Sequence, residues 1–378
     1  MQGGSVIMIN LDHAATTPLS REALDAMLPY FCEQYANASG GYADARRSRK
    51  AIDQARKEVA AAIGARPQEV YFTSGGTEAD NWAIFGAVST NSHRRHILTT
   101  AIEHHAVLNA CKAAQQQGYE VTYLMPDERG RITAQSVRDA IRPDTALVSV
   151  MMANNEVGTI EPIGEIAQIA RSNGSLMHTD AVQAVGHIPV DVASLGVDLL
   201  SISAHKFAGP KGIGALYIRS GTHLNRYLFG GEQERGLRAG TENTPAIVGM
   251  GKALTLACSS MTEMQRHVSM LRNRLQQGIK NLPGVRINGD LENRLDGHLH
   301  ISIDDASTQT LLMKLDMAGI AASAGSACAS GSLARSHVIE AMGIARENQA
   351  DIRFSIGANN TVEEIDKSIQ VICRLLMK

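Results

Sequence analysis

Between about residues 70 and 220, short apolar runs alternate with longer stretches in which apolar residues recur at helical spacing. Short runs rich in Val, Ile, Leu and Thr are typical of buried strands, and strands that alternate with helices are typical of a parallel sheet. This pattern predicts an α/β domain with a mostly parallel, seven-stranded sheet. The expected strands are 70–74, 96–100, 120–124, 146–152, 175–179, 199–203 and 213–218, with intervening helices such as 106–117 and 163–172.

After residue 242 the pattern changes to a long helical stretch followed by shorter apolar segments. Mixed, shorter elements of this kind predict a second, smaller α+β domain. We expect a large domain over 16–255 and a small domain made of 1–15 and 256–378. The remaining expected elements are a strand at 9–11, helices at 21–32 and 261–281, and strands at 285–288, 300–303, 321–323 and 352–355.

The composition narrows the choice of partners. With 44% hydrophobic residues the chain can bury a large core, and its formal net charge of −2 gives no field that would gather nucleic acid or an anionic membrane surface. No apolar run approaches the ~20 residues of a membrane span, and residues 1–10 lack the basic and apolar regions of a signal peptide. We therefore expect a cytoplasmic protein that binds a small molecule and neither nucleic acid nor membrane.

The five cysteines, an odd number without a C-x-x-C pair, argue against a disulfide framework and a structural zinc site. Cys328 differs from the others because it lies in the run Ser-Ala-Gly-Ser-Ala-Cys-Ala-Ser-Gly-Ser at 323–332. Such a loop is sterically open and suits a nucleophile that approaches a substrate and then moves away. The remaining cysteines lie on apolar helical patterns, where buried structural thiols are expected: Cys32, Cys111, Cys258 and Cys373.

Lys206 follows the expected strand 199–203 and precedes a Gly-Pro-Lys-Gly turn. Ligands of α/β sheets collect at the carboxyl ends of strands, where a partly desolvated lysine can form a Schiff base. Asp180 follows the preceding strand, so the two side chains should meet, and a carboxylate there suits the ring nitrogen of pyridoxal 5'-phosphate. Taken one at a time, a solvated loop lysine and a helix-capping aspartate also account for these residues.

Two further strand ends carry residues suited to the same ligand. Gly76 and Thr77 open a helix whose free N–H groups and hydroxyl suit a phosphate, although an ordinary strand-to-helix connection explains them too. His104 stands at the next junction, where an imidazole would stack on a cofactor ring and exchange protons near neutral pH. Metal binding is the competing interpretation, but no recognised ligand spacing is present among these residues: His104, His105, His178, His205 and Cys328.

Arg353 is flanked by apolar residues in the expected strand 352–355, so its guanidinium should be partly buried and should need an anion. The carboxylate of an amino-acid substrate and a structural salt bridge are equally good partners for it.

In combination these segments resemble the cysteine desulfurases, in the NifS- and IscS-like group I branch of the class V aminotransferase superfamily, whose members are fold-type I enzymes. The resemblance covers most of the chain. Its motifs are Leu-Asp-His-Ala-Ala-Thr-Thr-Pro at 11–18, Thr-Ser-Gly-Gly-Thr-Glu at 73–78, Asn-Asn-Glu-Val-Gly at 154–158, His-Thr-Asp-Ala-Val-Gln at 178–183, Ser-Ala-His-Lys at 203–206, Arg-Ala-Gly-Thr-Glu-Asn at 238–243 and Gly-Ser-Ala-Cys at 325–328.

The resemblance implies that pyridoxal 5'-phosphate is attached to Lys206, with Asp180 facing the ring nitrogen and His104 stacking on the ring. Asn155 and Arg353 would hold the substrate carboxylate, and Asn155 would also contact the cofactor. The remaining implied contacts are Gln183 with the phenolic oxygen, Gly76, Thr77, Ser203 and His205 with the phosphate, and Thr241 with the phosphate of the neighbouring subunit in a homodimer.

The activity implied by the resemblance is conversion of L-cysteine to L-alanine. Lys206 would move the α-proton, and Cys328 would receive the sulfur as a persulfide. A scaffold or carrier protein would then take the sulfur for iron–sulfur cluster assembly or for thiolation of tRNA or cofactors. A selenocysteine lyase is the nearest alternative, although Cys328 favours the desulfurase. An ordinary aminotransferase and an inert scaffold protein are further alternatives.

The chain departs from the family pattern in three places. Residues 35–42 read Tyr-Ala-Asn-Ala-Ser-Gly-Gly-Tyr where a Gly-Asn-Pro-Ser-Ser-like stretch followed by His is usual. Gly76 replaces a common alanine. The sequence ends at Lys378 without the longer tail of many members, so the sulfur acceptor is not indicated.

Overall fold

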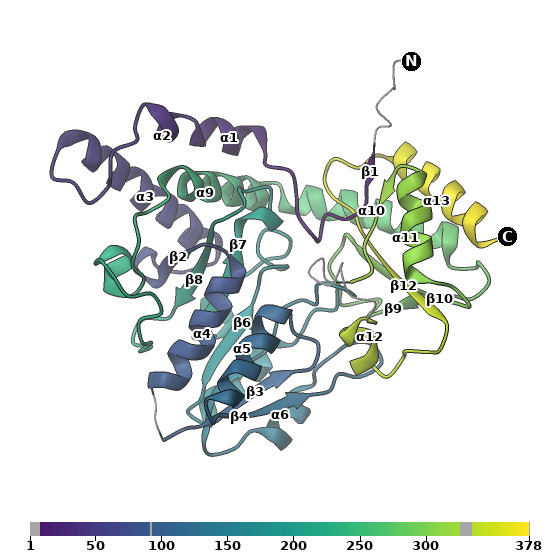
Figure 1. Ribbon diagram of the computed structural model, residues 1–378, viewed down its shortest axis with the longest axis horizontal. Helices are drawn as coiled ribbons and strands as arrows, with labels where there is room; N and C mark the ends of the chain where they lie inside the picture. Colours follow the sequence, from purple (N-terminus) through teal and green to yellow (C-terminus); the bar gives the residue numbers. More distant parts are fainter. Residues whose placement is uncertain (1–7, 91–92, 326–334, 378) are drawn as a thin grey trace.

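A computed structural model describes residues 8–90, 93–325 and 335–377. Its centre is a seven-stranded sheet with the strand order β2-β8-β7-β6-β5-β3-β4. β8 runs antiparallel to both of its neighbours, and every other neighbouring pair is parallel, which confirms the predicted sheet (Figure 1). The strands are β2 (Val70–Thr73), β3 (His96–Thr100), β4 (Glu120–Leu124), β5 (Thr145–Ser149), β6 (Leu176–Asp180), β7 (Leu199–Ser203) and β8 (Gly214–Ile218).

Both faces of this sheet are buried. Successive side chains of a strand point to opposite faces, so Leu147 belongs to the apolar cluster on one side that includes Trp82, while Val148 belongs to the cluster on the other side that includes Ile52. A strand covered on both faces reads as a continuous apolar run, which is why these strands were visible in the sequence. The helices around the sheet are α3 (Ala43–Ala62), α4 (Gly76–Thr90), α5 (His105–Gln116), α6 (Ala134–Ala140), α7 (Ile163–Ser172), α8 (Val192–Leu195) and α9 (Thr244–Ser259).

A second core lies beside the first and contains Leu11, Leu275, Ile301 and Phe354. It is built on a three-stranded antiparallel sheet of order β12-β10-β9 and on the parallel pair β1-β11, so the chain starts in this smaller unit and then crosses to the larger one (Figure 1). Its elements are β1 (Ile9–Asn10), α10 (Met261–Ile279), β9 (Val285–Asn288), β10 (His298–Asp304), α11 (Thr308–Met317), β11 (Ile320–Ala321), β12 (Gln349–Ser355) and α13 (Val362–Leu376).

Several expectations change in detail. The helix expected at 21–32 is two helices, α1 (Arg21–Met27) and α2 (Pro29–Cys32), because Pro29 has no N–H to continue the first one. α12 (His337–Ala341) packs on the larger core through Val338 and Ile339. The exact domain limits stay a prediction.

Cys111 is buried as expected, whereas Cys258 and Cys373 are half-buried. Cys32 is exposed, so the expectation of a buried thiol there was wrong. Pro29 starts a helix of only four residues, too short to bury a complete apolar face. Within the described ranges, no helix is both long and apolar enough to cross a membrane.

Candidate active site

Lys206 and Asp180 come together at the carboxyl ends of two adjacent strands. Asp180 is the last residue of β6 and pairs in register with Ser201 of β7, and Lys206 ends the 3-10 turn η2 (Ala204–Lys206) that follows β7. The Lys206 Nζ donates to the carbonyl oxygens of Ala14 and Ala15 at 2.6 and 2.9 Å. The predicted meeting of two strand ends is therefore confirmed.

The groups around Asp180 shift the pKa of its carboxyl in opposite directions. Burial raises the pKa of its carboxyl to about 6, while a hydrogen bond from the Val182 N–H, 2.9 Å from Oδ1, and the charge of Lys206 act in the opposite direction. The hydrogen bond from Val182 and the charge of Lys206 both favour the ionised form of Asp180, which is the form that would pair with a protonated ring nitrogen.

A cavity of about 470 Å³ opens in front of these two residues. This volume lies in the ordinary range for cofactor and ligand sites. Its lining includes most of the site residues expected from the sequence: Gly76, Thr77, His104, Asn155, Asp180, Gln183, Ser203, His205, Lys206 and Arg353.

One end of the cavity fits an anion. Gly75 has φ of 153°, a conformation that favours glycine, and a Cβ on Gly76 would lie only 2.7 Å from Val182 Cγ2, so glycine lets this turn pack closely at the edge of the cavity. α4 begins at Gly76 and runs for 15 residues, which gives its first N–H groups a positive dipole end. The side chains of Ser203 and His205 line the same cavity. Together these groups form a cradle suited to a phosphate.

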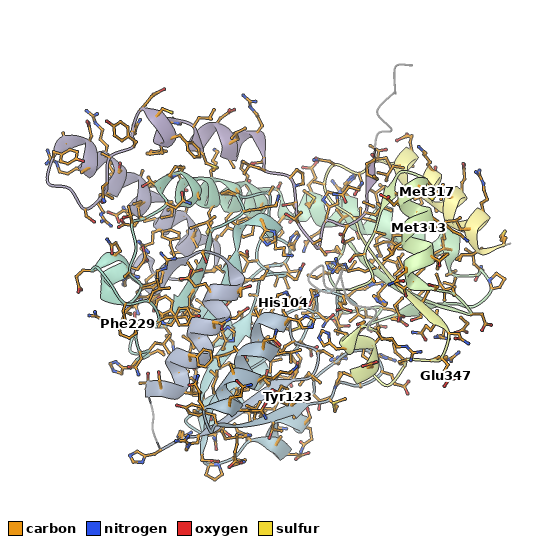
Figure 2. All side chains as sticks on the ribbon, viewed as in Figure 1. His104, Tyr123, Phe229, Met313, Met317 and Glu347 are labelled. Carbon is orange, nitrogen blue, oxygen red and sulfur yellow. The ribbon has the colours of Figure 1, made fainter. Side chains whose placement is uncertain are left out.

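His104 caps the N-terminus of α5, and its Nδ1 accepts from the Ala106 N–H at 3.1 Å. Burial, followed by the charge of Lys206, lowers the pKa of His104 to about 4. The imidazole is therefore neutral at pH 7, with its proton on Nε2. A pKa this low does not favour the expected proton exchange near neutral pH, and the role of His104 at the cofactor stays a prediction. Figure 2 shows His104 near the centre of the molecule, between the larger unit and the smaller one.

Arg353 is 1% exposed and has two partners from distant parts of the chain. Its Nη2 donates to Asp12 Oδ1 at 2.7 Å, and its Nη1 donates to the Asn155 carbonyl at 2.8 Å. The structural salt bridge left open by the sequence is therefore present. The Nε has no hydrogen-bond partner among the described residues, and the side chain lines the cavity. Its role as a carboxylate ligand stays a prediction.

Two predicted residues are not part of this cavity. Thr241 is exposed just before α9 and does not line it. Cys328 lies outside the described residues. The residues on either side of that segment lie against Glu156, the neighbour of Asn155 in the chain: Ser336 hydrogen-bonds to Glu156, and a Cβ on Gly325 would lie 2.8 Å from the Glu156 Oε2.

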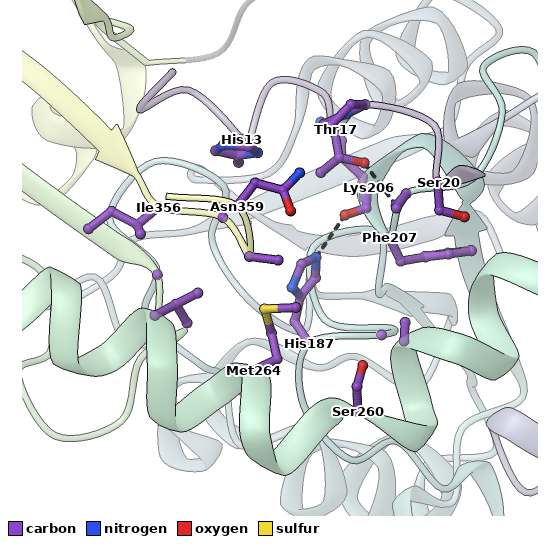
Figure 3. A pocket seen from close by; sticks show the side chains of 18 of the residues that line it. His13, Thr17, Ser20, His187, Lys206, Phe207, Ser260, Met264, Ile356 and Asn359 are labelled. Atoms are coloured by element: carbon purple, nitrogen blue, oxygen red, sulfur yellow. Dashed lines mark hydrogen bonds between the residues drawn. The ribbon is translucent and has the colours of Figure 1, made fainter. Parts of the chain in front are cut away.

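The sequence analysis missed a second cavity, of about 430 Å³, on the other side of Lys206. Figure 3 shows His13, His187, Met264 and Ile356 around it. The His187 Nε2 lies 2.9 Å from the main-chain oxygen of Lys206, so this wall supports the turn that carries the lysine. No local signal in the sequence distinguishes His187 from other buried histidines.

The sequence analysis also missed Asp80, which lines the cofactor cavity. Its position three residues after Thr77 is a usable signal, because residues at this spacing share a helix face. Within the described part of the chain, no group of three or more His, Cys, Asp or Glu residues is arranged to hold a metal.

The residues present fit pyridoxal 5'-phosphate. A strand-end lysine, a buried carboxylate beside it, a flat imidazole and an anion cradle are the groups that this cofactor needs. All four line one cavity.

Comparisons with known proteins agree with this fit. The family model of class-V aminotransferases matches residues 9–367. The cysteine desulfurase IscS of Methanosarcina thermophila is 48% identical over 372 residues, 98% of this chain and 92% of that protein. A solved NifS-like protein has a TM-score of 0.92 at 37% identity, with 98% of this chain and 99% of that chain covered.

A further solved structure, SspA in complex with cysteine, has a TM-score of 0.82 at 34% identity and covers 93% of this chain and 100% of its own. The resemblance seen in the sequence motifs is thus confirmed over nearly the full length. The chain belongs to the class-V aminotransferase family and, within it, to the cysteine desulfurases.

Proposed function

We propose that this chain, a cysteine desulfurase, transfers sulfur from L-cysteine to Cys328 and releases L-alanine, with Lys206 as the group that moves the α-proton. The observation that carries the proposal is the convergence of Lys206, Asp180 and His104 on one cavity with a phosphate cradle. Bound there, pyridoxal 5'-phosphate supplies an electrophilic aldehyde and an electron-withdrawing ring.

The roles of the residues follow from their positions. Lys206 Nζ lies at the end of β7 beside Asp180, where it takes a proton from the substrate α-carbon and returns it. Neutral His104 would pack on the cofactor ring, with its Nε2 proton available for donation. The guanidinium of Arg353 and the side chain of Asn155 hold the substrate carboxylate. Gln183, Ser203 and His205 orient the cofactor.

Sulfur transfer needs no outside oxidant. The Cys328 thiolate attacks the substrate sulfur, a sulfur–sulfur bond forms, and the bond between carbon and sulfur breaks. The electron pair goes to the β-carbon, which takes up one proton to become the alanine methyl group. Cys328 keeps a persulfide, and a carrier protein, a scaffold or a small thiol then accepts the outer sulfur. A cytoplasmic location stays a prediction.

Replacing Cys328 by serine tests this proposal. With L-cysteine and a thiol reductant, the wild-type protein should form alanine and sulfide in equal amounts. The Cys328→Ser variant should form both at least ~100-fold more slowly, because a hydroxyl is a much weaker nucleophile toward sulfur. Product analysis by chromatography and a sulfide assay gives the rates. Cys32→Ser, which changes an exposed thiol on α2, is the matched control.

Equal activity of the Cys328→Ser variant would contradict the proposal and would favour a lyase that needs no thiol. A variant that fails to bind L-cysteine is recognised separately, because addition of the amino acid changes the absorbance of the bound cofactor.

We also propose that two chains form a homodimer in which Thr241 completes the phosphate site of the other copy. Thr241 is exposed, and the ion pair between Glu242 and Arg49, 2.9 Å long, ties its segment to α3. Large apolar side chains are exposed on the same part of the molecule, which supports an apolar interface. They are Leu28, Phe31, Tyr35, Tyr42, Leu228 and Phe229.

Light scattering at micromolar concentration should therefore give the mass of two chains. Phe229, which is 82% exposed and labelled at the edge of the molecule in Figure 2, should contribute to the contact. Phe229→Glu should weaken the dimer at least ~10-fold, because it would bury an unpaired charge. Met317→Glu, on the opposite unit and 79% exposed, should leave the mass unchanged. A monomeric wild-type protein would contradict the proposal.

A further inference from the structure

Asp80 is a buried acid that the proposed mechanism does not use. It lies on α4, is 1% exposed and lines the cofactor cavity together with Asp180. Its Oδ1 has no hydrogen-bond partner among the described residues. Burying an ionised carboxylate without a paired cation costs free energy, so the protonation state of Asp80 requires an explanation.

The basic group beside Asp80 provides no positive charge. His178 Nε2 lies 3.6 Å from Asp80 Oδ1. His178 is fully buried, and its nitrogens lie 2.9 Å from the hydroxyl of Ser149 and 3.0 Å from that of Ser201. Burial lowers the pKa of His178 to about 3, so the imidazole is neutral. The hydrogen-bond donor to Asp80 is then the neutral hydroxyl of Ser201.

Lys206 and Lys211 line the same cavity, but the charges that act most strongly on Asp80 are those of acids. Burial, the negative charge of Asp180 and, more weakly, the charge of Glu103 all act to raise the pKa of Asp80 well above its usual range. Glu103 is itself buried, although Thr100 and the Met151 N–H donate to it at 2.9 and 2.8 Å. Burial raises its pKa to about 8.

The two aspartates are therefore unequal. Asp180 accepts a main-chain N–H bond from Val182 and lies near the cation of Lys206, whereas Asp80 has neither. Carboxyl groups that share a dry site do not both ionise, and the proton stays on the one with fewer donors and cations.

We propose that Asp80 carries the proton of this carboxyl pair and so leaves Asp180 ionised toward the cofactor nitrogen. Asp80 is then a positioning residue that acts through Asp180. The inference rests on the proposed place of Asp180 beside the ring nitrogen, but its test does not use cysteine or alanine.

Infrared spectroscopy of the holoenzyme tests the proposal directly. Aspartate is labelled with ¹³C at its carboxyl carbon, and spectra are taken at pH 8, about four units above the usual pKa of aspartate. The wild-type protein should show the C=O stretch of a protonated carboxyl, shifted by the label. The band should be absent from Asp80→Asn and present in Asp351→Asn, which changes another buried aspartate outside the cavity.

Glutamates such as Glu103 are silent in this experiment, because only aspartate carries the label. A label-sensitive band that survives in Asp80→Asn would place the proton on Asp180 and overturn the proposal. Absence of the band from the wild-type protein would overturn it as well.

Cofactor affinity gives a second, independent readout. Trp82 is the single tryptophan and lies on α4, whose first turn lines the cavity, so its fluorescence should change when pyridoxal 5'-phosphate binds the apoprotein. Asp80→Ala should weaken binding at least ~10-fold, because Ser201 and His178 lose their partner. Asp80→Asn should recover most of that loss, since it is neutral and can still accept from Ser201. An asparagine variant as weak as the alanine variant would mean that an ionised carboxylate is needed, which would contradict the proposal.

Discussion

Lys206→Arg should lower kcat for alanine formation by at least ~1,000-fold. Arginine keeps the positive charge and a similar length, but its guanidinium does not lose a proton at accessible pH and forms no Schiff base. Removing a proton-transfer group typically costs ~100- to 10,000-fold in rate, and here the same residue also holds the cofactor.

Rapid-mixing measurements of a single turnover give the rate, and absorbance before and after dialysis shows whether the cofactor remains attached. Lys252→Arg, on the exposed side of α9, is the matched control and should behave as the wild type. A Lys206→Arg variant within tenfold of the wild-type rate would show that another base moves the proton. Neutral His104, with its pKa near 4, would be a poor substitute.

Glu234→Ala should lower the free energy of unfolding by about 3–5 kcal/mol, because it removes one partner of a buried ion pair and leaves the other charged. Arg56 donates to both carboxylate oxygens of Glu234 at 2.7 and 2.8 Å, and the Phe72 N–H donates to Oε2 at 3.0 Å. The side chains of Arg56 and Glu234 are 8% and 3% exposed.

The same pair holds a strained turn. Glu234 and Arg235 have φ of 44° and 57°, a conformation that non-glycine residues adopt only when their surroundings require it. Loss of Glu234 should therefore also disorder the segment that leads to Thr241. Urea unfolding followed by circular dichroism gives the free energy. Asp366→Ala, which breaks an exposed pair with Arg274, should have little effect. An equally small change for Glu234→Ala would show that the pair contributes little.

Much of the active site was visible in short stretches of sequence. β3 and β7 begin and end at the predicted residues, because strands buried on both faces read as largely apolar runs. The half-buried edge strand β4 also begins and ends at the predicted residues. Lys206 and Asp180 were found for a related reason, since polar residues that directly follow such runs lie at the ligand-binding edge of the sheet. The glycines at the start of α4 indicated the anion cradle.

Other features depended on contacts between distant residues. Arg353 pairs with Asp12 across 341 positions of the chain, and no local pattern joins the two. Thr241 is exposed and does not line this chain's own cavity, and the contact that the resemblance implies, with the phosphate of a neighbouring subunit, stays a prediction. Cys32 lay on an apolar pattern, but Pro29 made its helix too short to bury the thiol.

Local sequence therefore specified the strands, the turns and the types of residue that end them, because hydrophobic periodicity and turn chemistry act over a few neighbouring residues. The protonation states and the ion pairs of these side chains depend on contacts in the folded protein. The lowered pKa of His104 and the raised pKa values of Asp180 and Asp80 arise from burial and from charges that approach through space. Desolvation exists only once the sheet, its helices and the second unit have closed around these groups.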